Sequence, residues 1–245
     1  MVIHKYIKRG LNHPNYCEDF VLHESRAEKF ELFGVFDGCS SGTDSHFASA
    51  FIAKVIRSEF HQLADKSNLP HEEFLKKLLF NLIITLKEEK QSLNLEQNEL
   101  LSTIILFLYD MRSNSGIIVS AGDGIVSING EHTIIDEDNV PDYLAYHLDK
   151  INSEQRFKMW YLMHTQQYFI DDLIDVSIST DGASSFVQTK KNMEKTEELP
   201  DVLDYLFKDE FLLKNKAMLG RKCNLLERKH GLVNGDDLGI VRIVK

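Results

Sequence analysis

Short strands joined by tight turns occupy the middle of the sequence. Residues 102–109, 116–121 and 125–128 are rich in Ile and Val, as strands usually are. Residues 113–116, Ser-Asn-Ser-Gly, are a turn signal between the first two, and Asn129-Gly130 is another turn signal. Strands joined in this way pair antiparallel. The run therefore predicts an antiparallel sheet and excludes a doubly wound parallel one.

Helical segments stand on both sides of this run. Apolar residues recur at helical spacing over residues 48–56 and 74–86, and helices are also predicted over 142–168 and 210–229. Helices cannot lie between strands that pair through hairpins, so they must cover the outer faces of the sheets. The predicted fold is therefore an α+β layered sandwich. Further strands are predicted at residues 20–23, 31–36, 175–179 and 238–244.

The composition is that of an ordinary globular protein. Of 245 residues, 43% are hydrophobic and 27% are charged, and no linker or repeat divides the chain, which predicts one domain over residues 1–245. The net charge of -10 disfavours nucleic acid and anionic membranes as partners. The three cysteines show no disulfide or zinc pattern, the first residues contain no signal peptide, and no apolar run could span a bilayer. We therefore expect a soluble, cytoplasmic monomer.

Acidic residues recur at the ends of the predicted strands. Asp37-Gly38 and Asp181-Gly182 each follow an apolar strand, and Asp123 stands between two strands. Glu18-Asp19 and Asp236-Asp237 each precede a strand. Any one of these aspartates alone is explained as a turn residue, because Asp-Gly is a common turn pair. If the strand ends converge, however, the carboxylates share one site, and their mutual repulsion requires cations to neutralise it.

These acidic residues belong to an ordered set of motifs. The motifs are Glu18-Asp19, Val35-Phe36-Asp37-Gly38, Ser102-Thr103, Gly122-Asp123, Ser179-Thr180-Asp181-Gly182 and Asp236-Asp237. From about Asn12 to the C-terminus, the set resembles that of the metal-dependent protein phosphatases, the protein phosphatase 2C family. The resemblance implies a four-layer α-β-β-α sandwich, in which helices flank two antiparallel sheets. It also implies an enzyme that acts on a phosphorylated protein and hydrolyses its phosphoserine or phosphothreonine.

The resemblance further implies a centre of two Mg²⁺ or Mn²⁺ ions. Asp37 would bridge both ions, and the Gly38 carbonyl would bind one of them. Asp181 and Asp236 would hold the other ion, which makes these two residues and Asp37 the predicted catalytic set. Oxygen ligands favour Mg²⁺ or Mn²⁺ over zinc or copper. Two such ions can hold a shared water, lower its pKa and offset the charge on the phosphoryl oxygens.

Three more acidic residues are implied as metal ligands. Glu18 and Asp19 would act mostly through bound waters. Asp123 matches a residue that serves an additional ion in many members of the family. Its expected partner position falls near Asn98-Glu99, where Asn98 is a poorer ligand and Glu99 could replace it. The sequence therefore leaves a third ion open.

Two positions depart from the family's pattern. The family usually has a phosphate-binding arginine shortly before the Glu-Asp pair, where this sequence reads His13-Pro14-Asn15-Tyr16-Cys17, and we predict Lys8 or Arg9 in its place. Many members have His after Asp-Gly, where this chain has Cys39. Both departures motivate an alternative, a catalytically inactive module that binds a phosphoprotein or another partner as a regulator. Residues 139–172 lie where the family inserts variable structure near the active site.

Overall fold

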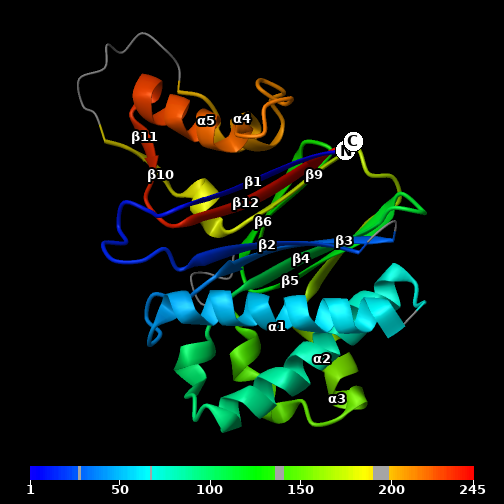
Figure 1. The fold of residues 1–245 in the computed structure, drawn as a ribbon. Helices are drawn as coiled ribbons and strands as arrows, with labels where there is room; N and C mark the ends of the chain where they lie inside the picture. Colours follow the sequence, from blue (N-terminus) through cyan, green and yellow to red (C-terminus); the bar gives the residue numbers. More distant parts are fainter. Residues whose placement is uncertain (27–28, 67, 136–140, 190–198) are drawn as a thin grey trace.

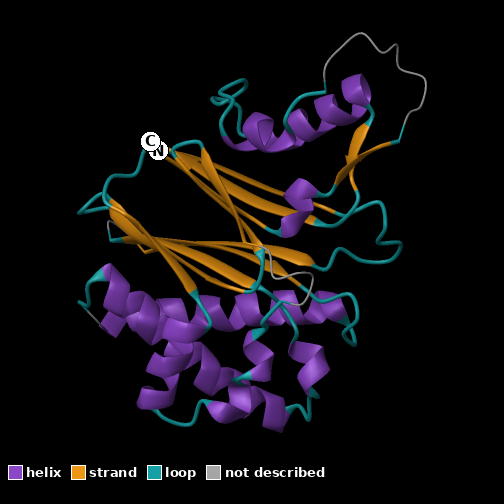
Figure 2. Ribbon diagram, turned by 180° about the vertical axis from the view of Figure 1, so that it is seen from behind, coloured by secondary structure: helices purple, strands orange, loops and turns teal. Residues whose placement is uncertain are grey.

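The computed structural model of the chain has four layers (Figures 1 and 2). Two antiparallel sheets lie face to face, α1, α2 and α3 cover the outer face of one sheet, and α4 and α5 cover the other. This arrangement confirms the predicted four-layer α-β-β-α sandwich. The structure describes residues 1–26, 29–66, 68–135, 141–189 and 199–245.

The sheet that contains both ends of the chain has the strand order β1-β12-β9-β6-β7. Every neighbouring pair in it is antiparallel. The last strand, β12, lies between β1 and β9, so the first and last strands of the chain pair directly. The strands are β1 (Val2–Lys8), β6 (Gly124–Ile128), β7 (Glu131–Ile135), β9 (Asp175–Ser179) and β12 (Leu238–Val244).

The second sheet has the order β2-β3-β4-β5-β8 and is also antiparallel throughout. A small two-stranded sheet, β10-β11, stands apart from it. The strands of these two sheets are β2 (Asp19–Arg26), β3 (Phe30–Asp37), β4 (Ile104–Asp110), β5 (Ser115–Ala121), β8 (Gln166–Ile170), β10 (Phe186–Gln188) and β11 (Leu232–Asn234).

Two long helices and several short ones form the outer layers. The α-helices are α1 (Ser45–Lys66), α2 (His71–Ser92), α3 (Glu154–Met163), α4 (Val202–Phe207) and α5 (Met218–Leu225). The 3₁₀ turns are η1 (Gln97–Leu100), η2 (Leu144–Tyr146), η3 (Leu148–Lys150) and η4 (Asp181–Ser184), and η5 (Leu226–His230) is a π-helical turn.

Three apolar cores fill the spaces between the layers. In β3, Leu32 and Phe36 pack towards the helices α1 and α2, whereas Phe33 and Val35 pack between the two sheets. A third core lies between β12 and the helices α4 and α5, and it includes Ile240. Because central strands are covered on both faces, they are apolar at successive positions, which explains their continuous runs in the sequence.

The predicted hairpin turns form where the sequence places them. Asn114 lies between β4 and β5 with φ of 56°, and Asn129 and Gly130 join β6 to β7 with φ of 53° and 82°. Asparagine and glycine adopt the left-handed region more readily than other residues, and two successive positive φ values are the hallmark of tight hairpins. These turns fix the antiparallel order of the middle strands, as predicted.

Two of the predicted helices are wrong in extent. Residues 210–217 form turns rather than the first half of a helix, and Leu212 has φ of 66°, so the helix begins only at Met218. Residues 142–168 contain two 3₁₀ turns and α3, and their end belongs to β8. In both segments, the apolar side chains recur at helical spacing although short turns carry many of them. Periodicity alone therefore overestimated the length of both helices.

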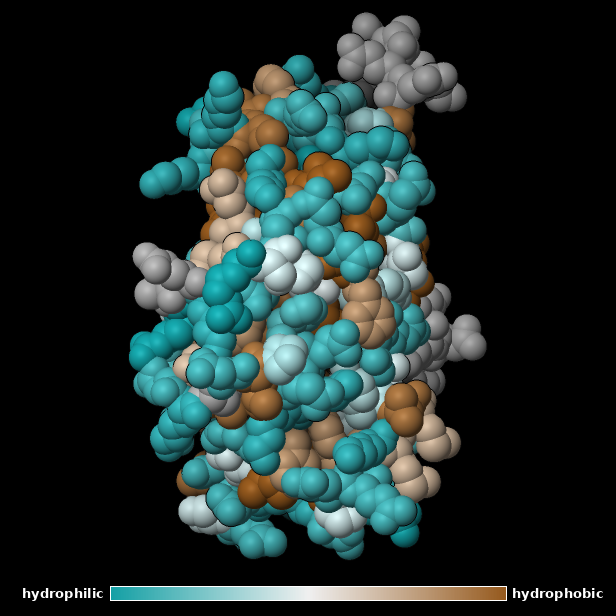
Figure 3. Space-filling view, turned by 90° about the vertical axis from the view of Figure 1, so that its right-hand side faces the viewer, coloured by the Kyte–Doolittle hydropathy of each residue, from teal (hydrophilic) through white to brown (hydrophobic). Residues whose placement is uncertain are grey.

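The outer surface agrees with a chain rich in charge. On the face seen in Figure 3, hydrophilic residues cover most of the area and hydrophobic residues form small groups between them. Of the helices within the described ranges, none is both long and apolar enough to cross a membrane.

Candidate functional site

Strand pairing brings two acidic residues together at one end of the sandwich. Asp19, the first residue of β2, lies directly opposite Asp37, the last residue of β3. Beyond this pair, Thr103 extends the edge: its N–H donates to the Asp37 carbonyl at 2.8 Å, and its Oγ1 accepts from the Asp37 N–H at 3.2 Å. The carboxylates of Asp19 and Asp37 therefore lie side by side at the end of this sheet, where backbone hydrogen bonds hold the strands together.

The other sheet contributes Thr180 and Asp181, which follow β9. The Thr180 hydroxyl donates to Oδ2 of Asp19 at 2.7 Å and also accepts from the Gly239 N–H at 2.9 Å. This contact joins the two sheets at their ends. It places Asp181, at the start of η4, beside the pair from β2 and β3.

Asp37 lies at the centre of the acidic cluster. Burial raises the pKa of its carboxyl well above the ordinary value, and neighbouring negative charges raise it further. The pKa of Asp19 is likewise raised, first by burial, although the Thr180 hydroxyl opposes the shift. The carboxylates that raise the pKa of Asp37, in order of effect, are Asp19, Asp181, Asp236 and Asp123.

Two glycines allow the backbone to approach these carboxylates closely. A Cβ on Gly38 would lie 2.2 Å from the Ser45 carbonyl oxygen, and a Cβ on Gly182 would lie 1.7 Å from the Asp237 carbonyl oxygen. No side chain can occupy either position without moving the backbone. The two Asp-Gly pairs are therefore not ordinary turns, because each glycine permits a contact between distant segments.

Asp237 connects the loop between β1 and β2 to the start of the last strand, β12. Its side chain is 1% exposed, and its carboxylate accepts hydrogen bonds from the backbone N–H groups of Gly10 and Glu18, at 2.6 Å for Gly10. The Asp237 N–H donates to Oδ1 of Asp236 at 2.7 Å. Asp237 therefore anchors the loop between β1 and β2, whereas Asp236 is the more exposed of the two and points to the acidic cluster.

Glu18 is held by two serine hydroxyls. The Ser40 hydroxyl donates to Oε2 of Glu18 at 2.7 Å, and the Ser45 hydroxyl donates to Oε1. The Glu18 carbonyl accepts from the Gly38 N–H at 3.1 Å. These contacts link the Glu18-Asp19 pair to the loop after β3 and to the start of α1.

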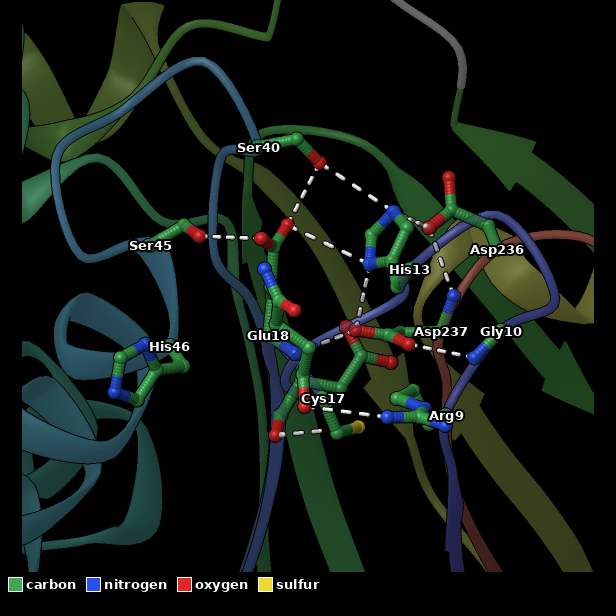
Figure 4. A network of polar contacts seen from close by, with 12 residues as sticks. Arg9, Gly10, His13, Cys17, Glu18, Ser40, Ser45, His46, Asp236 and Asp237 are labelled. Carbon is green, nitrogen blue, oxygen red and sulfur yellow. Dashed lines mark hydrogen bonds and ion pairs between the residues drawn. The ribbon is translucent and has the colours of Figure 1, made fainter.

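His13 lies between three carboxylates at the centre of this network (Figure 4). Its Nε2 is 3.1 Å from Oδ1 of Asp236, and its Nδ1 is 2.9 Å from Oδ2 of Asp237 and 3.6 Å from Oε2 of Glu18. Burial lowers the pKa of His13, but the hydrogen bond to Asp237 and the surrounding negative charges outweigh burial and raise it. Sequence reasoning assigned no role to His13, because its partners lie far away in the chain.

We expect His13→Ala to weaken binding of Mn²⁺ by about 10–100-fold, the usual cost of losing a residue that orients a metal ligand. His13 would act as a positioning residue, since its ring nitrogens face the carboxylates of Asp236, Asp237 and Glu18. The measurement is calorimetric titration of the protein with Mn²⁺. His46→Ala is the matched control, because His46 stacks on Tyr16 at 4.3 Å near the same loop. An equal loss in both variants would contradict the role of His13.

The two predicted phosphate-binding cations have other partners in the structure. Lys8 pairs with Glu227 at 3.3 Å. The Arg9 guanidinium donates to the carbonyl oxygens of Pro14 and Asn15 at 2.9 and 3.2 Å. Arg9 thus supports the loop that carries His13, and its role and that of Lys8 towards phosphate stay predictions.

A cavity of about 420 Å³ opens beside Glu18 and His13. The loop before β2 and the start of α1 line it, which places open space next to the acidic cluster.

Cys39, which follows Gly38, lies beside Tyr143. Burial together with the Cys39 thiol raises the pKa of Tyr143 above its ordinary value. Burial alone would raise the pKa of Cys39, but hydrogen bonds from Ser41 and Tyr143 lower it overall.

The donor set fits divalent cations. Oδ1 of Asp19 is buried and has no hydrogen-bond partner among the described residues. A buried carboxylate oxygen without a donor is costly unless a cation satisfies it. Because the side chains gathered around Asp37 are carboxylates, the chemistry there matches Mg²⁺ or Mn²⁺ rather than a sulfur-binding metal.

Solved structures of bacterial phosphatases share the fold. A bacterial serine phosphatase bearing a point mutation has a TM-score of 0.62 at 15% identity, with 100% of this chain and 98% of that chain covered. Stp1 from Staphylococcus aureus, a serine/threonine phosphatase, has a TM-score of 0.60 at 13% identity, with 100% and 95% covered. The catalytic domain of the serine/threonine protein phosphatase PstP, in complex with two manganese ions, has a TM-score of 0.56 at 14% identity, with 99% and 98% covered.

The sequence itself matches a family profile over most of its length. No curated protein matches the chain significantly. The profile described as protein phosphatase 2C, however, matches residues 10–213. That span includes β2 and β3, the turn that carries Asp123, and the Asp181-Gly182 pair. Sequence profile and fold agree, and the protein belongs to the protein phosphatase 2C family.

Proposed function

We propose that residues 1–245 form one catalytic domain that hydrolyses phosphoserine or phosphothreonine in proteins with the help of two Mn²⁺ or Mg²⁺ ions. The observation that carries the proposal is the convergence of carboxylates from both sheets around Asp37. Membership in the protein phosphatase 2C family supports the same reaction class. The complex of PstP with two manganese ions supports the number and kind of ions.

Each residue of the cluster has a distinct role in this proposal. Asp37 would bridge the two ions, and Asp181 and Asp236 would hold one of them. When bound, the ions supply a nucleophilic water at neutral pH and offset negative charge on the phosphoryl group. Further positions in the proposed ligand set are Glu18, Asp19, the Gly38 carbonyl and, for an additional ion, Asp123.

The protein's own hydrogen bonds keep these carboxylates in place. Thr180 orients Asp19, and His13 orients Asp236. Ser40 and Ser45 orient Glu18. Since Asp19, Asp236 and Glu18 are held before any cation arrives, these three carboxylates would need little reorganisation on binding.

Removing divalent ions should abolish the activity. With MnCl₂, the protein is expected to release phosphate from p-nitrophenyl phosphate and from a phosphothreonine peptide. EDTA should stop the release, and added MnCl₂ should restore it, because the carboxylates alone provide neither an electrophile nor an activated water. Hydrolysis that continues in EDTA would contradict the proposal.

Binding measurements beside the hydrolysis assay separate an enzyme from a binding module. Calorimetric titration with Mn²⁺ should show binding that depends on Asp181. A protein that binds a phosphothreonine peptide without hydrolysing it, at saturating Mn²⁺, would instead be a regulator.

A further inference from the structure

A second group of metal-binding side chains lies in the segment between β7 and β8. It consists of Asp142, His147 and His164, and we call it the Asp-His-His cluster. One nitrogen from each histidine and one carboxylate oxygen all lie within 4.8 Å of one another. All three residues are partly buried. None of them belongs to the acidic cluster around Asp37.

The carboxylate of Asp142 brings the two imidazoles together. Nε2 of His147 is 2.6 Å from Oδ1 of Asp142, and Nδ1 of His164 is 2.6 Å from Oδ2. The two imidazole rings are 4.2 Å apart between centroids, with an interplanar angle of 43°. Two nitrogens and a carboxylate thus point to one small volume.

Short helices fix the backbone at both histidines. His147 ends η2 and precedes η3, and its N–H donates to the Leu144 carbonyl at 2.9 Å. His164 follows α3, and its N–H donates to the Trp160 carbonyl at 2.8 Å. Because Leu144 and Trp160 are buried in the core, the backbone at both histidines is anchored to the core.

We propose that the Asp-His-His cluster binds a zinc-class divalent cation, with the three side chains as ligands and water in the remaining position. The cation would take the place of the protons that the two imidazole nitrogens donate to Asp142, and these protons would be released to solvent. Two imidazole nitrogens and one carboxylate are a ligand set that zinc accepts in four-coordinate sites. Imidazole selects Zn²⁺ and similar transition metals over Mg²⁺. The chain would then hold two kinds of cation site, one dominated by carboxylates and one rich in nitrogen.

The position of the cluster would place such a cation near the loop that follows β3. Tyr143, which follows Asp142, contacts Cys39, and Cys39 in turn follows Gly38. Tyr146 and Ser41 line one common cavity of about 450 Å³. A cation held by the Asp-His-His cluster would therefore fix the segment that covers the loop after β3. The proposal does not depend on the phosphatase activity proposed above.

Zinc stoichiometry tests the proposal directly. The full chain is dialysed against micromolar ZnSO₄ with excess Mg²⁺, which competes for the site dominated by carboxylates, and bound zinc is measured by elemental analysis. Wild type should bind one more zinc ion than the His147→Ala/His164→Ala double variant. The affinity of the single variants should fall by more than ~100-fold, since even residues that only orient a ligand contribute about 10–100-fold.

Two control variants separate this site from other ones. His61→Ala removes a histidine that pairs with Glu24 at 2.9 Å but has no second histidine beside it among the described residues, and it should keep the zinc ion. Asp181→Asn alters the acidic cluster and should also keep the ion. The visible spectrum of bound Co²⁺, which reports nitrogen ligands and low coordination number, should be the same in both controls and wild type.

Three results would overturn the proposal. Wild type that binds no zinc in excess Mg²⁺ shows that the cluster is only a hydrogen-bonded ion pair. A double variant that keeps the full zinc count, with an unchanged circular dichroism spectrum, places the zinc elsewhere. Equal loss in His61→Ala would show unspecific binding to surface histidines.

Discussion

Replacing Asp37 by asparagine is expected to lower kcat for p-nitrophenyl phosphate at least ~10³-fold at saturating Mn²⁺. Asp37 lies among the other carboxylates, and in the proposed site it would bridge the two ions. An amide has no charge and offers one oxygen instead of two. Losing one preorganised electrostatic group commonly costs about 10²–10³ in rate, and a bridging ligand serves both ions. Steady-state kinetics with increasing MnCl₂ measures the effect.

A variant that fails to fold would also lose turnover, so the unfolding temperature of Asp37→Asn is measured as well. The folded-state pKa of Asp37 is raised, so at neutral pH its ionised form destabilises the metal-free fold. Metal-free Asp37→Asn should therefore unfold at a temperature no lower than metal-free wild type. Asp149→Asn is the matched control, because Asp149 is 76% exposed and its one ion pair within the described ranges is with Lys90. Full turnover in Asp37→Asn would eliminate the proposed bridging role.

Gly182→Ala is expected to lower the free energy of unfolding by about 3 kcal/mol or more, the upper range for overpacking a buried site. The added Cβ would lie 1.7 Å from the Asp237 carbonyl oxygen and 3.2 Å from the Cα of Leu238. Both neighbours are backbone, so the strain cannot be relieved by turning a side chain. Either η4 or the start of β12 must move. Urea denaturation monitored by circular dichroism measures the loss.

Gly220→Ala gives the matched comparison. A Cβ there would lie 3.0 Å from the Tyr6 ring, which can shift, and alanine favours the helix over glycine by about 1 kcal/mol. Its unfolding free energy should change by less than ~1 kcal/mol. The Gly182 variant should also lose catalytic activity even where it stays folded, because Asp181 and Asp237 move with the strand end. A Gly182 variant as stable and active as Gly220→Ala would refute the close-approach argument.

The central strands could be predicted because burial on both faces makes them continuously apolar. β3, β4 and β12 all appear at or near their predicted ranges. Within the two large sheets, the strands missed by the sequence are the edge strands β1, β7 and β8, and both strands of the small sheet, β10 and β11, were missed as well. Their sequences, such as His4-Lys5-Tyr6 in β1, mix polar and apolar residues because edges are half exposed. An edge strand therefore resembles a loop or a helix end until its partner is known.

The acidic cluster could be predicted for a different reason. Strand ends in a sandwich meet at one edge, so carboxylates placed at several strand ends were expected to converge, and around Asp37 they do. What the sequence could not show was the support for these carboxylates. His13, Thr180 and Ser45 reach their partners across distances in the chain that no local pattern records. A histidine in a loop, in particular, offers no sign that three carboxylates will surround it.

The hydrogen bonds of Asp237 have a consequence for how the protein is made. Gly10 and Asp237 are 227 residues apart, yet their contact holds the loop that carries His13 and Glu18. During translation, that loop leaves the ribosome early. It cannot form its hydrogen bond to Asp237 until the start of β12 has also left the ribosome. Contacts of such long range are slow to form, so the acidic cluster should be among the last parts to assemble. A nascent chain that still lacks Asp237 and β12 would then have no partner to hold this loop, and the acidic cluster would stay incomplete until the end of the chain is made.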